Sequence, residues 1–130
     1  MFVTNLNEKQ QSILLELATN LIAADGIVDS KEQLMLSTLQ AQCHPNVKPE
    51  SASQTKLIDV FDSTAAKSSL LLELIGLAHA DDQYHETEKN FIYEVASTFN
   101  IDNSTLEDME TWVNRQMLLV KEAQYFMTEE

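Results

Sequence analysis

Two pairs of acidic residues recur with the same spacing and are the strongest candidates for chemistry in this sequence. Glu32 follows Asp25 by seven residues, and Glu88 follows Asp81 by the same interval. Each Asp falls where a predicted helix ends, so its charge faces the negative end of the helix dipole at a cost of about 0.3 to 1 kcal/mol. Amides of the following loop or a bound cation would offset that cost. Each Glu falls in the first turn of the next predicted helix, where it can accept the N-cap amide.

The first loop matches the second half of a calcium-binding EF-hand loop, with Gly26 in the glycine position and Glu32 in the last position. The first and third ligand positions fall on Leu21 and Ala23, which excludes a true EF-hand. A weaker site of carboxylates and loop carbonyls would suit Ca²⁺, Mg²⁺ or Mn²⁺. The alternative is a purely structural role in capping helices. The candidate metal ligands are the acidic residues of both loops, namely Asp25, Asp29, Glu32, Asp81 and Glu88.

Two similar helix-loop-helix units position these pairs. Sliding the chain by 56 residues, from Asp25 to Asp81, places residues 21–32 over residues 77–88 without a gap. Leu, Ala, Asp and Glu are identical at matching places, and apolar residues align on both sides. We therefore expect two hairpins packed around a pseudo-twofold axis.

Apolar residues recur at helical spacing almost throughout the chain, which predicts an all-α fold, a compact bundle of about six to seven helices. Asn7 with Gln10 and Ser104 with Glu107 are predicted capping boxes, and Asn100 is a predicted left-handed helix end. We expect one domain over residues 1–130, with repeat one over about 8–42, a linker over about 43–53, repeat two over about 64–99 and a C-terminal helix over about 104–127.

Composition excludes several classes of protein. The chain of 130 residues carries a net charge of −13, which opposes binding to nucleic acid and to anionic lipid. Only two Gly and two Pro argue against a β-sandwich or barrel. The apolar stretch 70–80 is too short to span a membrane, and the first residues do not resemble a signal peptide. With Cys43 as the single cysteine, these features predict a soluble cytoplasmic protein.

Acidic residues are concentrated in the second half of the sequence. Residues 81–110 hold nine acidic residues and one basic residue, Lys89. This stretch is either a solvated face or a docking surface for a basic protein partner. In the docking interpretation the contact residues are Asp82, Glu86, Glu107, Asp108 and Glu110.

The last predicted helix offers a further interaction surface. Its apolar residues, from Trp112 to Met127, spread beyond one stripe. One interpretation is that part of this helix is buried against a second copy, as a homodimer, or against another protein. The other is that it packs back onto both hairpins.

An enzyme is not expected. The sequence has no nucleophile elbow, no glycine-rich phosphate loop and no Cys with a recognisable His partner. His85 and Glu88 are spaced for one helix face, but their order is the reverse of that in di-iron bundles. Gly76, alone in the central predicted helix, is interpreted as allowing the close approach of another helix.

A helix ending in Ala-Asp-Gly, a loop, and a helix opening on Glu, repeated as Ala-Asp-Asp and Glu, resembles the tellurite-resistance TerB-like family. A domain of this family also occurs in a membrane-anchored J-domain co-chaperone. The resemblance covers about residues 8–127 and implies an all-helical fold with Asp25, Glu32, Asp81 and Glu88 at characteristic acidic positions. It implies a non-catalytic module that can bind a metal and is associated with the stress response at the inner face of the membrane, with membrane-associated stress proteins as partners. Asp82 in place of glycine and His85 in place of the capping Asp depart from the pattern.

Overall fold

The structure is a computed structural model and describes residues 1–24, 26, 28, 30–80 and 84–128. These residues form helices and loops without a strand, so the all-α prediction is confirmed. A 3₁₀ helix, η1, which the sequence did not predict, precedes six α-helices. Their bounds are η1 Val3–Asn5, α1 Glu8–Ile22, α2 Ser30–Gln42, α3 Gln54–Val60, α4 Thr64–Ala78, α5 Glu86–Thr98 and α6 Asn103–Met127.

The internal repeat is visible in the helix boundaries. The bounds of α1 and α2 recur 56 residues later as the bounds of α4 and α5. The N-caps correspond as well, because Asn7 precedes α1 and Ser63 precedes α4. Asn7 accepts a hydrogen bond from the Gln10 amide at 2.8 Å, and the Gln10 side chain accepts one from the Asn7 amide at 2.9 Å. The predicted capping box at the start of α1 is therefore confirmed.

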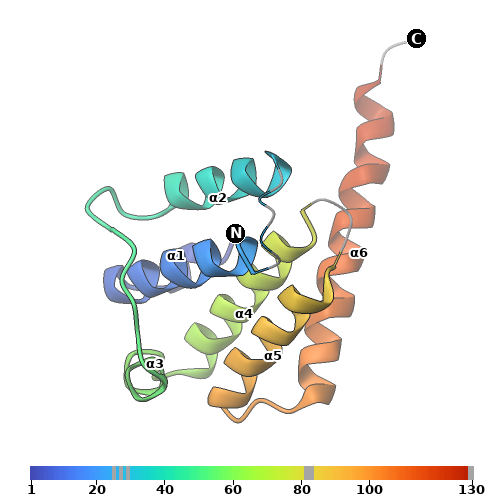
Figure 1. Cartoon of the computed structure of the whole chain (residues 1–130). Coiled ribbons are helices and arrows are strands. Elements are labelled where there is room, and N and C mark those ends of the chain that lie inside the picture. Colours follow the sequence, from blue (N-terminus) through green and yellow to red (C-terminus); the bar gives the residue numbers. More distant parts are fainter. Residues whose placement is uncertain (25, 27, 29, 81–83, 129–130) are drawn as a thin grey trace.

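Helix α4 lies at the centre of the bundle and contacts α1, α2, α5, α6 and η1 (Figure 1). Its sequence is apolar on nearly every side, which suits a helix covered on all faces. The side chains of Leu70, Leu71, Leu74 and Ile75 are fully buried.

Helix α2 lies at the outside of the bundle, above α1 in the view of Figure 1. It buries only Glu32 and Leu39, and Leu34 is 68% exposed. The extended segment after α2 runs along one side of the molecule to α3 (Figure 1). Several contacts attach it to α1; among them, the Glu50 amide donates to the Ser12 carbonyl at 3.0 Å and the Glu50 carboxylate pairs with Lys9.

Helix α6 begins two residues earlier than the predicted capping box allows. Its N-cap is Asp102, whose carboxylate accepts a hydrogen bond from the Thr105 amide at 2.8 Å, so the prediction of Ser104 as the cap is wrong. The preceding turn is as predicted, because Asn100 has a φ of 58° and ends α5 in the left-handed conformation. The Ile101 amide then donates to the Ala96 carbonyl at 3.0 Å.

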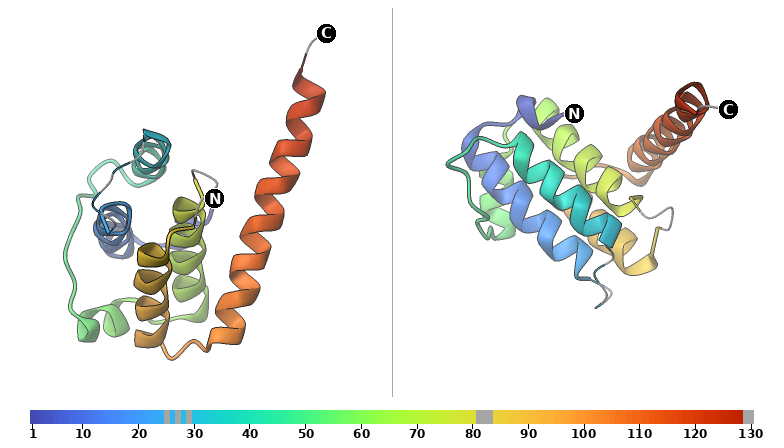
Figure 2. Two further views of the ribbon diagram at one scale, coloured as in Figure 1. Left: turned by 45° about the vertical axis from the view of Figure 1, so that its right-hand side comes forward. Right: turned by 90° about the horizontal axis from the view of Figure 1, so that it is seen from above.

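The two halves of α6 differ in their packing. The first half packs against α4 and α5 and buries Leu106 and Val113. The second half extends past the end of the bundle and points away from it (Figures 1 and 2). The helix thus packs back along only part of its length, and the rest is exposed.

Candidate functional site

The glutamates of the two acidic pairs occupy equivalent buried places. Glu32 is 2% exposed in the first turn of α2, and Glu88 is 1% exposed in the first turn of α5. The sequence predicted their location in the helix but not their burial. The predicted ligands Asp25, Asp29 and Asp81, together with Asp82, lie outside the described residues.

One carboxylate oxygen of Glu88 caps the N-terminus of α5. Glu88 Oε1 accepts a hydrogen bond from the His85 amide at 3.3 Å, so Glu88 closes the N-terminus of α5. His85 is the N-cap residue of that helix. A carboxylate at this end of the helix is also favoured by the helix dipole. The predicted helix-capping role of Glu88 is therefore confirmed by this contact.

A cluster of aromatic and acidic side chains joins the second hairpin to α6. The Tyr84 ring packs on the His79 ring with centroids 4.4 Å apart. The Tyr93 hydroxyl donates to Glu110 Oε1 at 3.1 Å. The Tyr84 hydroxyl is buried beside Glu110, and this burial together with the nearby carboxylate raises the pKa of Tyr84 well above its ordinary value. Glu110 is therefore a structural link between α5, α6 and the segment that precedes α5.

The described residues do not by themselves form a metal centre. Within residues 1–24, 26, 28, 30–80 and 84–128, no group of three or more His, Cys, Asp and Glu side chains could hold one ion. Each hairpin contributes one buried carboxylate from this part of the chain, Glu32 or Glu88. Carboxylates are the oxygen donors that Ca²⁺, Mg²⁺ and Mn²⁺ prefer, so both residues fit such an ion chemically.

The predicted partner-binding acids lie in different environments. Glu86, at the start of α5, and Glu107 and Asp108, in the first turns of α6, are exposed. Glu110 is half-buried and accepts the Tyr93 hydrogen bond described above. The surface that a basic partner could reach is therefore carried by the first three residues.

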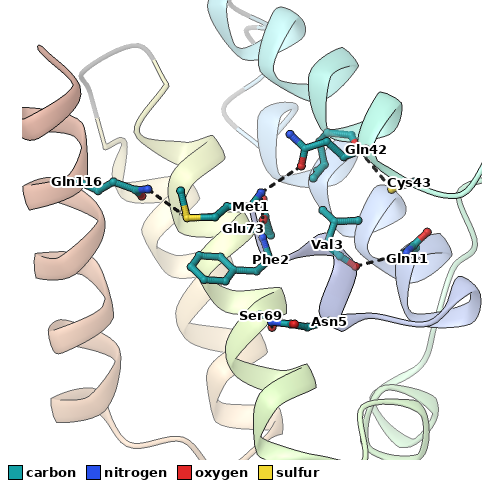
Figure 3. Close-up of polar contacts among 11 residues, drawn as sticks. Met1, Phe2, Val3, Asn5, Gln11, Gln42, Cys43, Ser69, Glu73 and Gln116 are labelled. Atoms are coloured by element: carbon teal, nitrogen blue, oxygen red, sulfur yellow. Dashed lines mark hydrogen bonds and ion pairs between the residues drawn. The ribbon is translucent and has the colours of Figure 1, made fainter. Parts of the chain in front are cut away.

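A groove between α2, α4 and α6, which the sequence did not predict, contains a partly buried acid. Glu73 of α4 accepts hydrogen bonds from the Phe2 amide at 2.7 Å and the Met1 ammonium at 3.1 Å (Figure 3). Gln42 also accepts a bond from the Met1 ammonium, at 3.2 Å. A cavity of about 170 Å³ remains beside this contact. The N-terminal segment therefore fills part of the groove.

The structure also accounts for two isolated residues of the sequence, Gly76 in this groove and Cys43. Gly76 lines it, and a Cβ atom added there would meet no atom within 4 Å, so the interpretation of Gly76 as a site of close helix approach is wrong. Cys43 is buried, and its thiol donates to the Leu39 carbonyl at 3.4 Å. Burial and the charge of Glu73 raise the pKa of Cys43, which keeps the thiol protonated and weakly nucleophilic.

The second half of α6 exposes more large apolar side chains than any other described helix. These side chains are 52 to 87% exposed in the monomer and belong to Leu118, Leu119, Val120, Tyr125, Phe126 and Met127. Soluble monomers rarely leave such a contiguous apolar surface uncovered. The sequence indicated the excess of apolar residues but not which half of the helix would leave the bundle.

Comparison with known protein families tests the TerB-like resemblance in the second half of the bundle. Residues 49–111 match the family of tellurite resistance protein TerB. This stretch is TerB-like. It contains α3, α4, α5 and the beginning of α6, and with them the second acidic pair. The resemblance inferred from the Ala-Asp and Glu motifs is thereby confirmed.

Other comparisons add nothing to the TerB match. No curated protein and no solved structure gives a significant match to this chain. The first hairpin is linked to the TerB-like stretch by the 56-residue repeat of helix bounds. In the part of the chain that the structure describes, no helix is both long and apolar enough to cross a membrane.

Proposed function

We propose that this protein is a non-catalytic TerB-like module of the tellurite-resistance and stress-response type, whose two acidic hairpins bind a divalent cation. The observation that carries the proposal is the burial of Glu32 and Glu88, which are 2% and 1% exposed at equivalent positions of the two hairpins. Ca²⁺, Mg²⁺ and Mn²⁺ are the ions that this carboxylate chemistry suits.

The burial of a carboxylate has an energetic consequence that supports this proposal. An ionised group withdrawn from water is stable only where donors or opposite charges replace its hydration. The helix dipole and the His85 amide supply part of that replacement at Glu88. The acids Asp25, Asp29 and Asp81 are close in sequence to these glutamates, and a cation shared with them would add an opposite charge beside each buried carboxylate. In the metal-free alternative, the loop amides alone replace the lost hydration.

Calorimetric titration of chelator-treated protein with Ca²⁺, Mg²⁺, Mn²⁺ and Zn²⁺ tests the proposal. We expect saturable binding of at least one of the first three ions. Glu32→Gln and Glu88→Gln, which keep the shape of the side chain and remove its charge, should weaken binding by about tenfold or more. Glu86→Gln is the matched control, because Glu86 is exposed in the same helix turn as Glu88.

The outcome that would reject cation binding is equally clear. If none of the ions binds the wild-type protein below millimolar concentration, Glu32 and Glu88 only cap helices. If Asp25→Asn and Asp81→Asn retain full affinity while the glutamate variants lose it, the loop aspartates are not ligands. In that case Glu32 and Glu88 hold the ion at the N-termini of α2 and α5.

Docking of another protein is a second candidate function, supported by the exposed apolar surface of α6. It does not depend on the hairpins, because the exposed side chains lie in the half of the helix that leaves the bundle. The exposed acids Glu86, Glu107 and Asp108 would favour a basic partner. Binding that is equally strong at low and high salt would exclude a role for these acids.

A further inference from the structure

We infer that the outward face of α6 binds the same face of a second copy of this chain, with the two helices antiparallel. Three large apolar residues recur on this face every seven residues. They are Trp112, Leu119 and Phe126, which are 36%, 62% and 87% exposed. A seven-residue repeat keeps side chains on one face of a helix and is the pattern by which two helices pair.

This face points away from the core of its own bundle. The residues of α6 that pack inward are Leu106, Met109, Val113 and Met117, which lie on a different side of the helix from Leu119 and Phe126. Trp112, at the proximal end of this face, also lines the groove beside α4, whereas Leu119 and Phe126 are 62% and 87% exposed. At 1.5 Å per residue, Trp112 and Phe126 are about 21 Å apart along the helix, so the face is about four turns long.

Charges on this face select both the partner and the orientation. Arg115 and Glu122 are exposed and lie between the three apolar residues, two turns apart. In a parallel pair each would face its own counterpart, which brings like charges together. In an antiparallel pair with Leu119 near the twofold axis, Arg115 of one copy faces Glu122 of the other. The same pairing places Trp112 beside Phe126 of the second copy.

A second copy fits this surface better than an unrelated protein because the surface is self-complementary. A twofold contact uses the same patch on both molecules, so the patch must match itself when reversed. From Trp112 to Phe126 the order is apolar, basic, apolar, acidic and apolar. When this order is reversed, each apolar residue meets an apolar residue and each charge meets the opposite charge, which satisfies that condition. The shape of the molecule also permits the contact, because the distal half of α6 extends beyond the bundle (Figure 2). Trp112 is held in place on one side by the Phe2 ring, at a centroid distance of 5.7 Å.

Reversal of the two charges tests the inference, with sedimentation equilibrium as the measurement. We expect the wild-type protein to form a dimer in a concentration-dependent manner. Arg115→Glu and Glu122→Arg should each raise the dimer Kd by about tenfold or more, because each places like charges together at two symmetric contacts. The double variant R115E/E122R restores opposite charges and should return the Kd to near the wild-type value.

A matched control separates this effect from a general change of net charge. Glu94→Arg makes the same charge change as Glu122→Arg at an exposed site of α5 and should leave the Kd unchanged. All four positions are exposed, so circular dichroism should show the same helix content in every variant. Leu119→Cys supplies a second readout, because two copies of residue 119 near the axis should form an intermolecular disulfide on oxidation. Cys43 is buried and should not compete.

Two results would overturn the inference. The first is a wild-type protein that stays monomeric at every concentration tested and whose Leu119→Cys variant does not crosslink. The second is a dimer in which R115E/E122R is as weak as the single variants. The inference does not depend on cation binding, because none of these variants changes Glu32 or Glu88.

Discussion

The two hairpins have the same helix lengths and corresponding N-caps, yet they are stabilised in different ways. In the first hairpin, α1 is well buried and α2 lies on the outside of the bundle, with contacts to α1, α4 and η1. In the second hairpin, α4 is the centre of the molecule and α5 contacts α1, α3, α4 and α6. Position in the bundle, rather than the motif itself, therefore determines how much of each helix is buried.

The segments that lead into the second helices show the same contrast. Val28 of the first hairpin corresponds to Tyr84 of the second, and Val28 is 51% exposed. Tyr84 instead packs on His79 and lies beside Glu110 of α6. The first loop depends on Gly26, whose φ of 79° favours glycine. Among the described residues of the two loops, Gly26 is thus distinguished by its backbone conformation and Tyr84 by its side-chain contacts.

The largest expected effect tests the difference between the central and the outer helix. Leu74→Ala should lower the free energy of unfolding by about 3 kcal/mol, because Leu74 is fully buried in α4 and its neighbours cannot close the cavity. Leu39→Ala in α2 should cost less, about 2 kcal/mol, because its surroundings can relax towards solvent. Urea unfolding measures both values. An equal or larger loss for Leu39→Ala would contradict the assignment of α2 as the outer helix.

The pH dependence of stability tests the side-chain anchor of the second hairpin. Burial and then Glu110 raise the pKa of Tyr84, so the folded protein holds a proton that the unfolded chain releases above about pH 10. The contribution of Tyr84 to stability should be complete below that pH and should fall above it, by at most about 1.4 kcal/mol per pH unit. Urea unfolding between about pH 9 and about pH 11, on either side of the ordinary pKa of tyrosine, measures this loss of stability. The variant Tyr84→Phe should show a smaller loss of stability at alkaline pH.

The matched control for this experiment is Tyr125→Phe, at a site 81% exposed in α6. It should leave the alkaline loss of stability unchanged. If Tyr84→Phe and Tyr125→Phe behave alike, the Tyr84 hydroxyl does not anchor the second hairpin to α6.

The smallest expected effects concern the two glycines. Gly26→Ala should destabilise the protein by about 1 kcal/mol, because alanine is strained at this positive φ. Gly76→Ala should stabilise it by about 0.5 to 1 kcal/mol, because alanine favours the helix and a Cβ atom meets nothing nearby. Thermal unfolding of both variants gives the signs. Loss of stability in Gly76→Ala would show that the groove is closed in solution.

Most of the fold could be predicted from local patterns. Helical periodicity, the cap at Asn7 and the left-handed Asn100 depend on residues close in sequence, and all three are correct. The start of α6 was misassigned because Asp102 and Ser104 are both good N-caps, and the choice between them depends on the preceding turn. The 3₁₀ helix was missed because its Val3 is buried by distant parts of the chain.

The candidate site was less predictable because it depends on contacts distant in sequence. The spacing of Glu32 and Glu88 located both in first helix turns, but their burial results from the packing of whole helices. Glu73 was not predicted as a site residue, because its contacts with Met1 and Phe2 join residues 72 and 71 positions apart. The predicted site residues in the two loops, Asp25, Asp29, Asp81 and Asp82, remain predictions.

The gap-free correspondence of α1 and α2 with α4 and α5 also has an evolutionary meaning. Two units of equal length, with matching helix ends, are what a tandem duplication of one ancestral hairpin would leave behind. After such an event each copy is free to diverge while the other retains the original role. The departures at Asp82 and His85, both confined to the second copy, follow that course. The second copy nevertheless lies within residues 49–111, the stretch that matches TerB, so in this protein the copy with Asp82 and His85 is the one that retains the family's sequence pattern.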